Sequence, residues 1–576
     1  MTKLQQILEF LNKTAGKTFY LFVIIFIFSS ILESLGLSLV IPVVALILEP
    51  NFLNILKNSS FEPYVPDFIF NFNNFEAIVF FSIAIVVIYI VKNIILLIAT
   101  YSINLLVGKI NSKIQKKIIE IYLHQNLIFH SRKSFSEINA NINQKVKEVT
   151  NGVLMSFLQL LSEIFIITSI LILIFFLGFQ DVLYLMLIFL LFSLILVKFS
   201  KNFLRSISFK RETKINEKFK SLHNIVNNLR EFILLGNFQK QFKSFYESLY
   251  AENRLTAYNQ ALQKTPFVLF EILGIMGLIL IIFYLKFQDA STVKIISGCS
   301  FFAAASYKVL PSLNRIVSYY YQINFYSPSL ESLVKDLELK SKIMYHKEKF
   351  KFKNFIKLEN ISFSYDQDKK KNILKNINLK IKKNEIIGII GESGSGKSTL
   401  LDMISCLIKP NLGNIYLDDE IINDDYKIRK FQNIISYASQ KTSVMNSTLK
   451  ENICMQKDTE IDHERYINAL NLSELNDFVN EYGDDIKIND YGKNISGGQL
   501  QRIGVAKALY LDRDIIIFDE VTSSLDSTIE KKIIDNICNK IKDKTIIIVT
   551  HRPYNLKYCD NIYKLSDNDL KRITEV

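Results

Sequence analysis

The sequence predicts two domains of different fold class: an α-helical polytopic membrane domain with six spans, followed by an α/β domain of the phosphate-loop type. Six apolar stretches long enough to cross a bilayer occupy the first half of the chain. From residue 353 onward, short apolar runs alternate with helical patterns, which is typical of an α/β domain. A glycine-rich stretch at 391–399 lies between one such apolar run and a helix.

The composition fits an apolar part joined to an ordinary globular part. Of the 576 residues 49% are hydrophobic, yet 22% are charged. The net charge of +13 is compatible with nucleic acid or with lysine-rich loops beside a membrane, and six spans exclude a nucleic-acid-binding ATPase. Five scattered cysteines without paired spacing argue against a disulfide framework or a zinc site and indicate a reducing compartment.

The predicted spans share lengths of about 20 residues or more, the fourth being the shortest and the sixth the most polar. They cover approximately 19–48, 75–107, 153–177, 182–197, 266–285 and 293–316. The first is too long for the apolar part of a signal peptide, so we expect it to be a retained span.

Lysine and arginine near the span ends predict the orientation. They gather before the first span and in the two long connections, 108–152 and 199–265, so both termini and these connections should face the cytoplasm. Apolar residues at four-residue spacing predict that the spans continue there as helices. Two short, partly apolar turns, 126–130 and 229–238, suit docking on another domain or local packing. The first outer loop, 49–74, could hold a surface helix or a packed loop.

The stretch at 391–399 matches G-x-x-x-x-G-K-[ST] in the expected strand–turn–helix context. Its backbone N–H groups would cradle phosphate oxygens, Lys397 would reach the β- and γ-phosphates, and the Ser398 hydroxyl would bind Mg²⁺. A chance glycine turn is the alternative. The candidate nucleotide-binding residues here are Gly391, Glu392, Ser393, Gly394, Ser395, Gly396, Lys397, Ser398 and Thr399.

Two adjacent carboxylates follow the apolar run 515–518. Asp519 is placed to hold the Mg²⁺ shell, and Glu520 to orient or deprotonate the attacking water. Taken alone, the pair could equally be solvated loop residues.

The stretch Ile495-Ser496-Gly497-Gly498-Gln499 resembles the signature of the ATP-binding cassette (ABC) family, with Ile in place of the usual Leu. The Ser496 hydroxyl and the glycine amides at a helix start would form a second anion site. In the family this site contacts the γ-phosphate of a nucleotide that is held by the opposite subunit.

Further positions match the family residue by residue. Tyr365 matches the aromatic residue that stacks on adenine, and Gln440 matches the glutamine that touches Mg²⁺ and the docking helices. The stretch Ser523-Ser524-Leu525-Asp526 matches the dimer-crossing loop, and His551 matches the switch histidine near the γ-phosphate. The chain departs from the pattern at Asp490, where relatives often have Glu.

The resemblance covers the whole chain and implies the half-transporter layout of ABC exporters, with ATP and Mg²⁺ as cofactors. We expect a membrane domain at 1–328, a linker at 329–352 and a nucleotide-binding domain at 353–576. One phosphate loop and one signature per chain imply a homodimer with two equivalent ATP sites. The intact hydrolytic positions imply an active ATPase rather than a regulator or channel.

The membrane half resembles bacterial lipid-linked oligosaccharide flippases at 29–42 and 307–316, and Glu163 and Glu271 fall at similar places. That resemblance implies a translocase of protein glycosylation in the bacterial inner membrane, with no nucleic-acid partner. It would flip a polyprenyl-pyrophosphate-linked glycan among membrane lipids. The alternative is an exporter of a peptide, a drug or another lipid with the same motor.

Three cations in the spans are candidate substrate residues. Lys308 and Arg315 are seven residues apart and therefore share a helical face, where Lys92 could join them. Together they would suit a pyrophosphate. The alternative is that they tie helices together by pairing with the glutamates of the spans, Glu33, Glu163 or Glu271.

Overall fold

The structure is a computed structural model that describes residues 16–48, 53, 57, 67–176, 180–288, 292–339, 348–365, 372–456, 460–489, 492–522 and 524–573. The chain forms two compact units, residues 1–123 with 133–340, and residues 124–132 with 341–576. Most of the first outer loop, and Asp490 and Ser523, lie outside the described residues.

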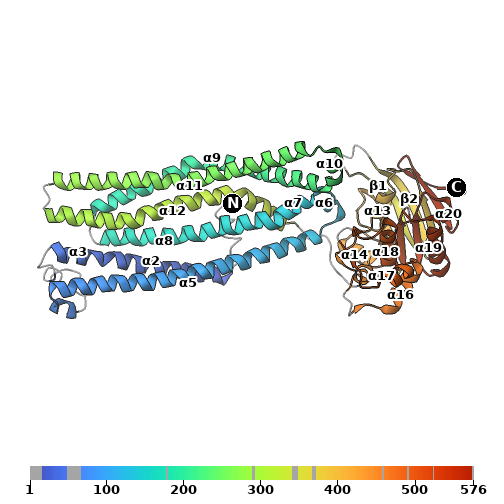
Figure 1. Cartoon of the computed structure of the whole chain (residues 1–576), viewed down its shortest axis with the longest axis horizontal. Coiled ribbons are helices and arrows are strands. Elements are labelled where there is room, and N and C mark those ends of the chain that lie inside the picture. The colour runs from blue at the N-terminus through green and yellow to red at the C-terminus, as the bar shows by residue number, and fades with distance from the viewer. Residues whose placement is uncertain are drawn as a thin grey trace. The chain divides into compact units, whose positions relative to one another are not determined.

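The first unit is a bundle of long helices that run alongside one another (Figure 1). Its long α-helices are α2 (Lys17–Ser38), α5 (Asn74–Leu123), α8 (Met155–Phe176), α9 (Gln180–Asn227), α11 (Gln239–Phe287) and α12 (Thr292–Leu337). Shorter elements are α3 (Val40–Leu48), the 3-10 turn η2 (Asp67–Asn71), α7 (Phe135–Asn139), the π-helical turns η3 (Ala140–Lys145) and η4 (Glu148–Leu154), and α10 (Leu229–Leu235).

Among the described residues, five helical segments are long and apolar enough to cross a membrane, and they cover the first five predicted spans to within one residue at each end. The sixth predicted span lies in α12, which is not one of these five segments. The first span is two helices rather than one, because α2 ends at Ser38 and α3 begins at Val40. Pro42 explains the break, since its ring has no N–H and clashes with the carbonyl of the residue four positions earlier.

Several helices are longer than a bilayer is thick. α5 has 50 residues, which corresponds to about 75 Å, against roughly 30 Å for the hydrocarbon core. The remaining turns must therefore lie outside the hydrocarbon, as the patterns of 108–152 and 199–265 predict. α12 also continues through Pro328 to Leu337, so the predicted linker begins as helix.

The second unit is built on a six-stranded sheet of order β12-β11-β3-β10-β9-β6. All neighbouring strands from β11 to β6 are parallel, and only β12 is antiparallel. The strands are β3 (Ile386–Ile390), β6 (Ile435–Ala438), β9 (Ile515–Asp519), β10 (Thr545–Val549), β11 (Asn561–Ser566) and β12 (Asp569–Ile573). β9 and β10 are buried along their whole length, as expected for central parallel strands.

A four-stranded antiparallel sheet and several helices complete this unit (Figure 1). The sheet has the order β2 (Leu374–Lys382), β1 (Phe355–Phe363), β4 (Leu412–Leu417), β5 (Glu420–Ile421), and β7 (Ser447–Thr448) pairs separately with β8 (Lys487–Ile488). The helices are α13 (Lys397–Ile404), α14 (Asp425–Gln432), α15 (Leu449–Cys454), α16 (His463–Leu472), α17 (Asn476–Tyr482), α18 (Gly497–Tyr510), α19 (Ser527–Lys540) and α20 (Pro553–Leu556).

One short helix from the membrane half of the sequence, α6 (Leu127–Arg132), belongs to the second unit. Ile128 packs against the core shared by the two sheets, and the Arg132 guanidinium donates to the Tyr365 carbonyl at 3.2 Å. The predicted combination of a helical membrane domain and an α/β domain is confirmed.

Candidate functional site

The predicted ATP-site residues of one chain gather at one edge of the parallel sheet. Strands β3, β10, β9 and β6 are neighbours, and all run in the same direction. Their carboxyl ends therefore meet, and this is where ligands bind in open α/β sheets. The phosphate loop follows β3, Gln440 follows β6, Glu520 follows β9, and His551 follows β10.

The phosphate loop has a backbone that only glycine can follow at several points. Gly394 and Gly396 have φ angles of +82° and +103°, in the left-handed region that side chains rarely adopt. A Cβ on Gly391 would stand 2.6 Å from the Leu565 carbonyl oxygen. The loop is thus held in a tight turn, and Glu392, Ser393 and Gly394 are exposed at its top.

The polar groups of the loop fit a phosphate ligand. The Lys397 ammonium is buried and donates to the carbonyls of Gly391 (2.9 Å) and Glu392 (3.0 Å). The Ser395 hydroxyl oxygen is buried without a hydrogen-bond partner among the described residues. An unpaired buried hydroxyl is costly, so its presence inside a glycine-rich turn at a helix start points to a ligand.

Glu520 is the centre of the cluster. Its carboxylate accepts a hydrogen bond from Gln440 Nε2 at 2.7 Å and lies 2.9 Å from His551 Nε2. Lys397 Nζ is 3.7 Å from the same carboxylate. Glu520 also has a φ of +51°, which is uncommon for a residue with a side chain and frequent at functional sites. Three of the sequence-predicted residues therefore converge on the predicted catalytic carboxylate.

Asp519 and Ser398, the predicted metal ligands, are hydrogen-bonded to each other. Asp519 is 5% exposed, and its carboxylate accepts from the Tyr437 hydroxyl at 3.0 Å. Burial raises the pKa of Asp519, and the hydrogen bonds from Tyr437 and Ser398 only partly offset this. A carboxylate beside a hydroxyl is a hard oxygen donor set suited to Mg²⁺, and the cation would favour the ionised form.

Tyr365 lies beside the end of the phosphate loop. Its hydroxyl is 3.4 Å from Thr399 Oγ1, its ring packs edge-on against Phe363, and the side chain is half-exposed. An exposed aromatic ring next to the phosphate cradle is available for a base.

The signature stretch is ordered by its own helix. Ser496 caps α18: its hydroxyl accepts from Gln499 N at 3.2 Å, while Gln499 Oε1 accepts from Ser496 N at 2.8 Å. The capping box satisfies only some of the first four N–H groups of the helix. The remaining amides are available to bind an anion. A Cβ on Gly498 would stand 3.3 Å from Leu525 Cδ2, so the signature also borders the dimer-crossing loop.

The structure does not bring the signature and the phosphate loop of one chain together. Within the described residues, no hydrogen bond or ion pair connects 496–499 to 391–399. Asp526 begins α19 and accepts from Thr528 Oγ1 at 2.8 Å. Among the described residues, neither Asp526 nor 496–499 makes a hydrogen bond or an ion pair with Glu520.

Two supporting groups of the site were not predicted from sequence. Tyr437, which holds Asp519, is such a residue. Glu530 on α19 is the other: it is 3% exposed and accepts from Thr522 Oγ1 and Asn555 Nδ2, both at 2.7 Å, and from Arg552. A glutamate on the apolar face of an amphipathic helix is the one sequence signal that could have revealed this network.

The three candidate substrate cations are paired within the chain. Glu33 is 4% exposed and binds Lys92 and, at 2.5 Å, Lys308. Arg315 makes a two-pronged contact with Glu163, with N–O distances of 2.6 and 3.1 Å. The pairing alternative therefore describes these cations better than a free cationic surface does.

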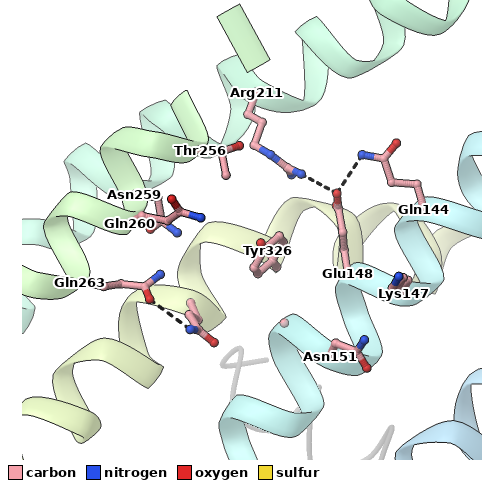
Figure 2. A pocket seen from close by; sticks show the side chains of 12 residues that line it. Gln144, Lys147, Glu148, Asn151, Arg211, Thr256, Asn259, Gln260, Gln263 and Tyr326 are labelled. Atoms are coloured by element: carbon pink, nitrogen blue, oxygen red, sulfur yellow. Dashed lines mark hydrogen bonds and ion pairs between the residues drawn. The ribbon is translucent and has the colours of Figure 1, made fainter. Parts of the chain in front are cut away.

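A polar cavity of about 450 Å³ lies in the first unit between η3, η4, α9, α11 and α12 (Figure 2). At one side, Arg211 donates to Glu148 Oε1 at 2.7 Å, and Gln144 donates to the same oxygen at 3.0 Å. Gln263 and Asn259 line the other side, and Asn259 Oδ1 is buried without a partner among the described residues. The cavity is large and polar enough for several ordered waters.

Fold and site together define a membrane protein whose helical domain is fused to a phosphate-loop ATPase domain. Residues 22–304 match the ABC transporter transmembrane region, and residues 374–523 match the ABC transporter family. The chain belongs to the ABC transporter family, and its second half is an ABC ATPase domain, of the kind that couples ATP hydrolysis to transport.

Similar proteins agree with this assignment. The chain is 36% identical over 221 residues to a lactococcin-G-processing and transport ATP-binding protein of Lactococcus lactis, covering 38% of this chain and 31% of that protein. It is 35% identical over 222 residues to a leukotoxin translocation ATP-binding protein of Mannheimia haemolytica, with 38% and 31% covered. The chain thus spans about a third of the length of these curated relatives.

One solved structure resembles the whole fold. A bacterial Atm1-family ABC exporter with ATP bound superposes with a TM-score of 0.77, covering 97% of this chain and 94% of that one. At 15% identity this likeness establishes the exporter fold alone.

Proposed function

We propose that two copies of this chain form an ATP-driven exporter in a cytoplasmic membrane, with the ATPase domains and both termini on the cytoplasmic side. The observation that carries the proposal is the convergence of Gln440, His551 and Lys397 on Glu520 beside the phosphate loop. A carboxylate held in this way can orient a water for attack on a γ-phosphate.

Each side chain then has a distinct task. Lys397 exchanges its loop carbonyls for the β- and γ-phosphates, and the Ser395 hydroxyl gains a partner. Ser398, Asp519 and Gln440 would hold Mg²⁺, and the ion would supply positive charge to offset that of the phosphates. Glu520 takes or directs the proton of the attacking water, His551 orients Glu520 and the γ-phosphate, and the Tyr365 ring stacks on the base.

Two features support a homodimer. Among the described residues, no hydrogen bond or ion pair joins the capped signature at 496–499 to the phosphate loop of its own chain, so a second copy would complete the ATP site. In addition, α10 carries apolar side chains that are largely exposed in the single chain: Ile233, Leu234 and Leu235 are 71%, 77% and 75% exposed. A contiguous apolar surface of this kind is typical of an interface. We propose that α10 docks on the partner's ATPase domain.

For the cargo, we favour export of a peptide or another amphiphile over flipping of a lipid-linked oligosaccharide. The relatives named for lactococcin and leukotoxin support this choice. The pairing of Lys92 and Lys308 with Glu33 also weakens the argument for a pyrophosphate site, because Glu33 offsets one of the two positive charges. The flippase interpretation rests on the sequence resemblance at 29–42 and 307–316.

The motor is tested by ATP hydrolysis of the purified chain in nanodiscs. Glu520→Gln should lower the rate by about 10²–10⁴-fold, since it removes the base while keeping the hydrogen bond to Gln440. ATP binding should remain. Hydrolysis at the wild-type rate in this variant would rule out Glu520 as the catalytic carboxylate.

The cargo is tested in liposomes. A fluorescent lipid-linked oligosaccharide and a labelled amphiphilic peptide are presented separately, and Glu520→Gln serves as the inactive control. We expect ATP-dependent peptide uptake without ATP-dependent exposure of the glycan to an external glycosidase. Glycan exposure that is lost in Glu520→Gln would instead support flipping.

A further inference from the structure

A second pocket in the membrane helices combines an apolar wall with the carboxylate of Glu271, which has no hydrogen-bond or ion-pair partner among the described residues. It has a volume of about 430 Å³ and lies between α11 and α12. Gly274 allows the two helices to approach here, because a Cβ at that position would stand 2.7 Å from Leu310 Cδ1. The pocket is the size of a small-molecule site.

The wall of the pocket is aromatic. Phe270 and Phe302 are 1% exposed and form its floor, whereas Phe267 and Tyr307 are 51% and 77% exposed at its rim. Aromatic faces attract organic cations and exclude anions, because each ring face carries partial negative charge.

Glu271 on α11 lines this apolar pocket, and its side chain is exposed in the single chain. The other two glutamates considered for the spans, Glu33 and Glu163, are satisfied by Lys92, Lys308 and Arg315. Within the described residues, Glu271 makes no hydrogen bond or ion pair. A carboxylate within a span is expensive and normally faces a partner or a site of function.

Ser306 is a second polar group without a partner. It lines the same pocket, is 9% exposed, and its hydroxyl oxygen has no hydrogen bond among the described residues. In an apolar pocket the carboxylate favours a positively charged ligand, and the hydroxyl adds a polar group to the same wall.

We propose that this pocket binds the cationic group of an amphiphilic substrate: one organic cation carried on an apolar body. The apolar body contacts Phe267 and Tyr307, and the positive charge lies against Glu271. The proposal rests on the exporter function and names the substrate class of that function. It is incompatible with a pyrophosphate at the same place, since Glu271 would repel it.

Two ions of nearly identical shape and opposite charge test the proposal. The full chain in nanodiscs, without ATP, is titrated with tetraphenylphosphonium and with tetraphenylborate, and uptake by empty nanodiscs is subtracted. Tetraphenylphosphonium should bind saturably, and tetraphenylborate at least about tenfold more weakly. Equal affinity for the two ions, or no saturable binding of the cation, would overturn the proposal.

Variants assign the effect to Glu271. Glu271→Gln should weaken tetraphenylphosphonium binding about tenfold, whereas Glu271→Asp, which keeps the charge, should stay within about threefold. Glu247→Gln is the matched control, because Glu247 lies on the same helix with its side chain 65% exposed and outside the pocket. Unchanged binding in Glu271→Gln would show that the cation binds elsewhere or that a cation of the partner copy occupies the pocket.

Failure of this proposal and failure of the exporter function are distinguishable. Cation binding is measured without ATP, whereas the exporter function is judged by ATP hydrolysis and its loss in Glu520→Gln. If the chain hydrolyses ATP but shows no preference for the cation, only the proposal about the pocket is refuted, and the exporter function stands.

Discussion

Replacing Glu33 with Gln tests whether Lys92 and Lys308 stabilise the helix bundle through their ion pairs with Glu33. Glu33 contacts two ammonium groups, and the side chains of Lys92 and Lys308 are 8% and 24% exposed. The variant keeps the shape of the side chain but leaves these charges without a counterion. Lys308 is more exposed and can be solvated by water. The loss of stability therefore comes mainly from the buried, unpaired charge of Lys92.

Breaking a buried ion pair by removing one partner typically costs about 3–5 kcal/mol. At roughly 2 °C per kcal/mol for a large domain, Tm should fall by about 6–10 °C. The assay is thermal unfolding of the detergent-solubilised chain, followed by loss of the monodisperse peak. Glu33→Gln/Lys92→Met should recover most of the loss, because an apolar replacement of both partners is often neutral.

Glu247→Gln is again the matched control. Because the Glu247 carboxylate is highly exposed, this substitution should change the free energy of unfolding by less than about 0.5 kcal/mol. A Glu33→Gln protein that melts within about 1 °C of wild type would refute the reasoning. The lysines would then be free for another role, and the pyrophosphate interpretation would regain its basis.

Two further predictions concern the ATPase domain. Glu530→Gln should destabilise it by about 1–3 kcal/mol and slow hydrolysis, since Arg552 next to His551 loses its charged partner; unchanged chemical denaturation and ATPase rates would contradict this. Burial raises the pKa of the Cys406, Cys538 and Cys559 thiols to about 12, so at pH 8 their thiolate fraction is roughly a thousandfold below that of an ordinary thiol. A thiol reagent at pH 8 should therefore label them slowly until the chain is unfolded, and fast labelling of the native protein would argue against their burial.

Sequence alone predicted the elements of the ATP site because each is local. The phosphate loop needs glycines at fixed offsets, and the catalytic carboxylate needs an apolar strand before it. The parallel sheet then brings together what lies far apart in sequence: Gln440, Glu520 and His551 end neighbouring strands and meet at one edge.

Pairing between helices could not be derived in the same way. Whether Lys308 faces a substrate or Glu33 depends on how α2, α5 and α12 are packed, and the pattern of one helix does not contain this information. The same holds for Tyr437 and Glu530, which are ordinary residues on their own elements and acquire a role only through their neighbours. The break at Leu39 was not predicted either, although Pro42 is a local sequence signal for it.

The central claim is that the phosphate loop of one copy and the signature of another form one ATP site. Ser395→Cys and Ser496→Cys, introduced together into the Glu520→Gln chain, test it by oxidative cross-linking with and without MgATP. The account predicts a covalent dimer that forms on addition of MgATP and is absent from either single cysteine variant. A cross-link within one chain, or none at all under conditions where ATP is bound, would contradict it.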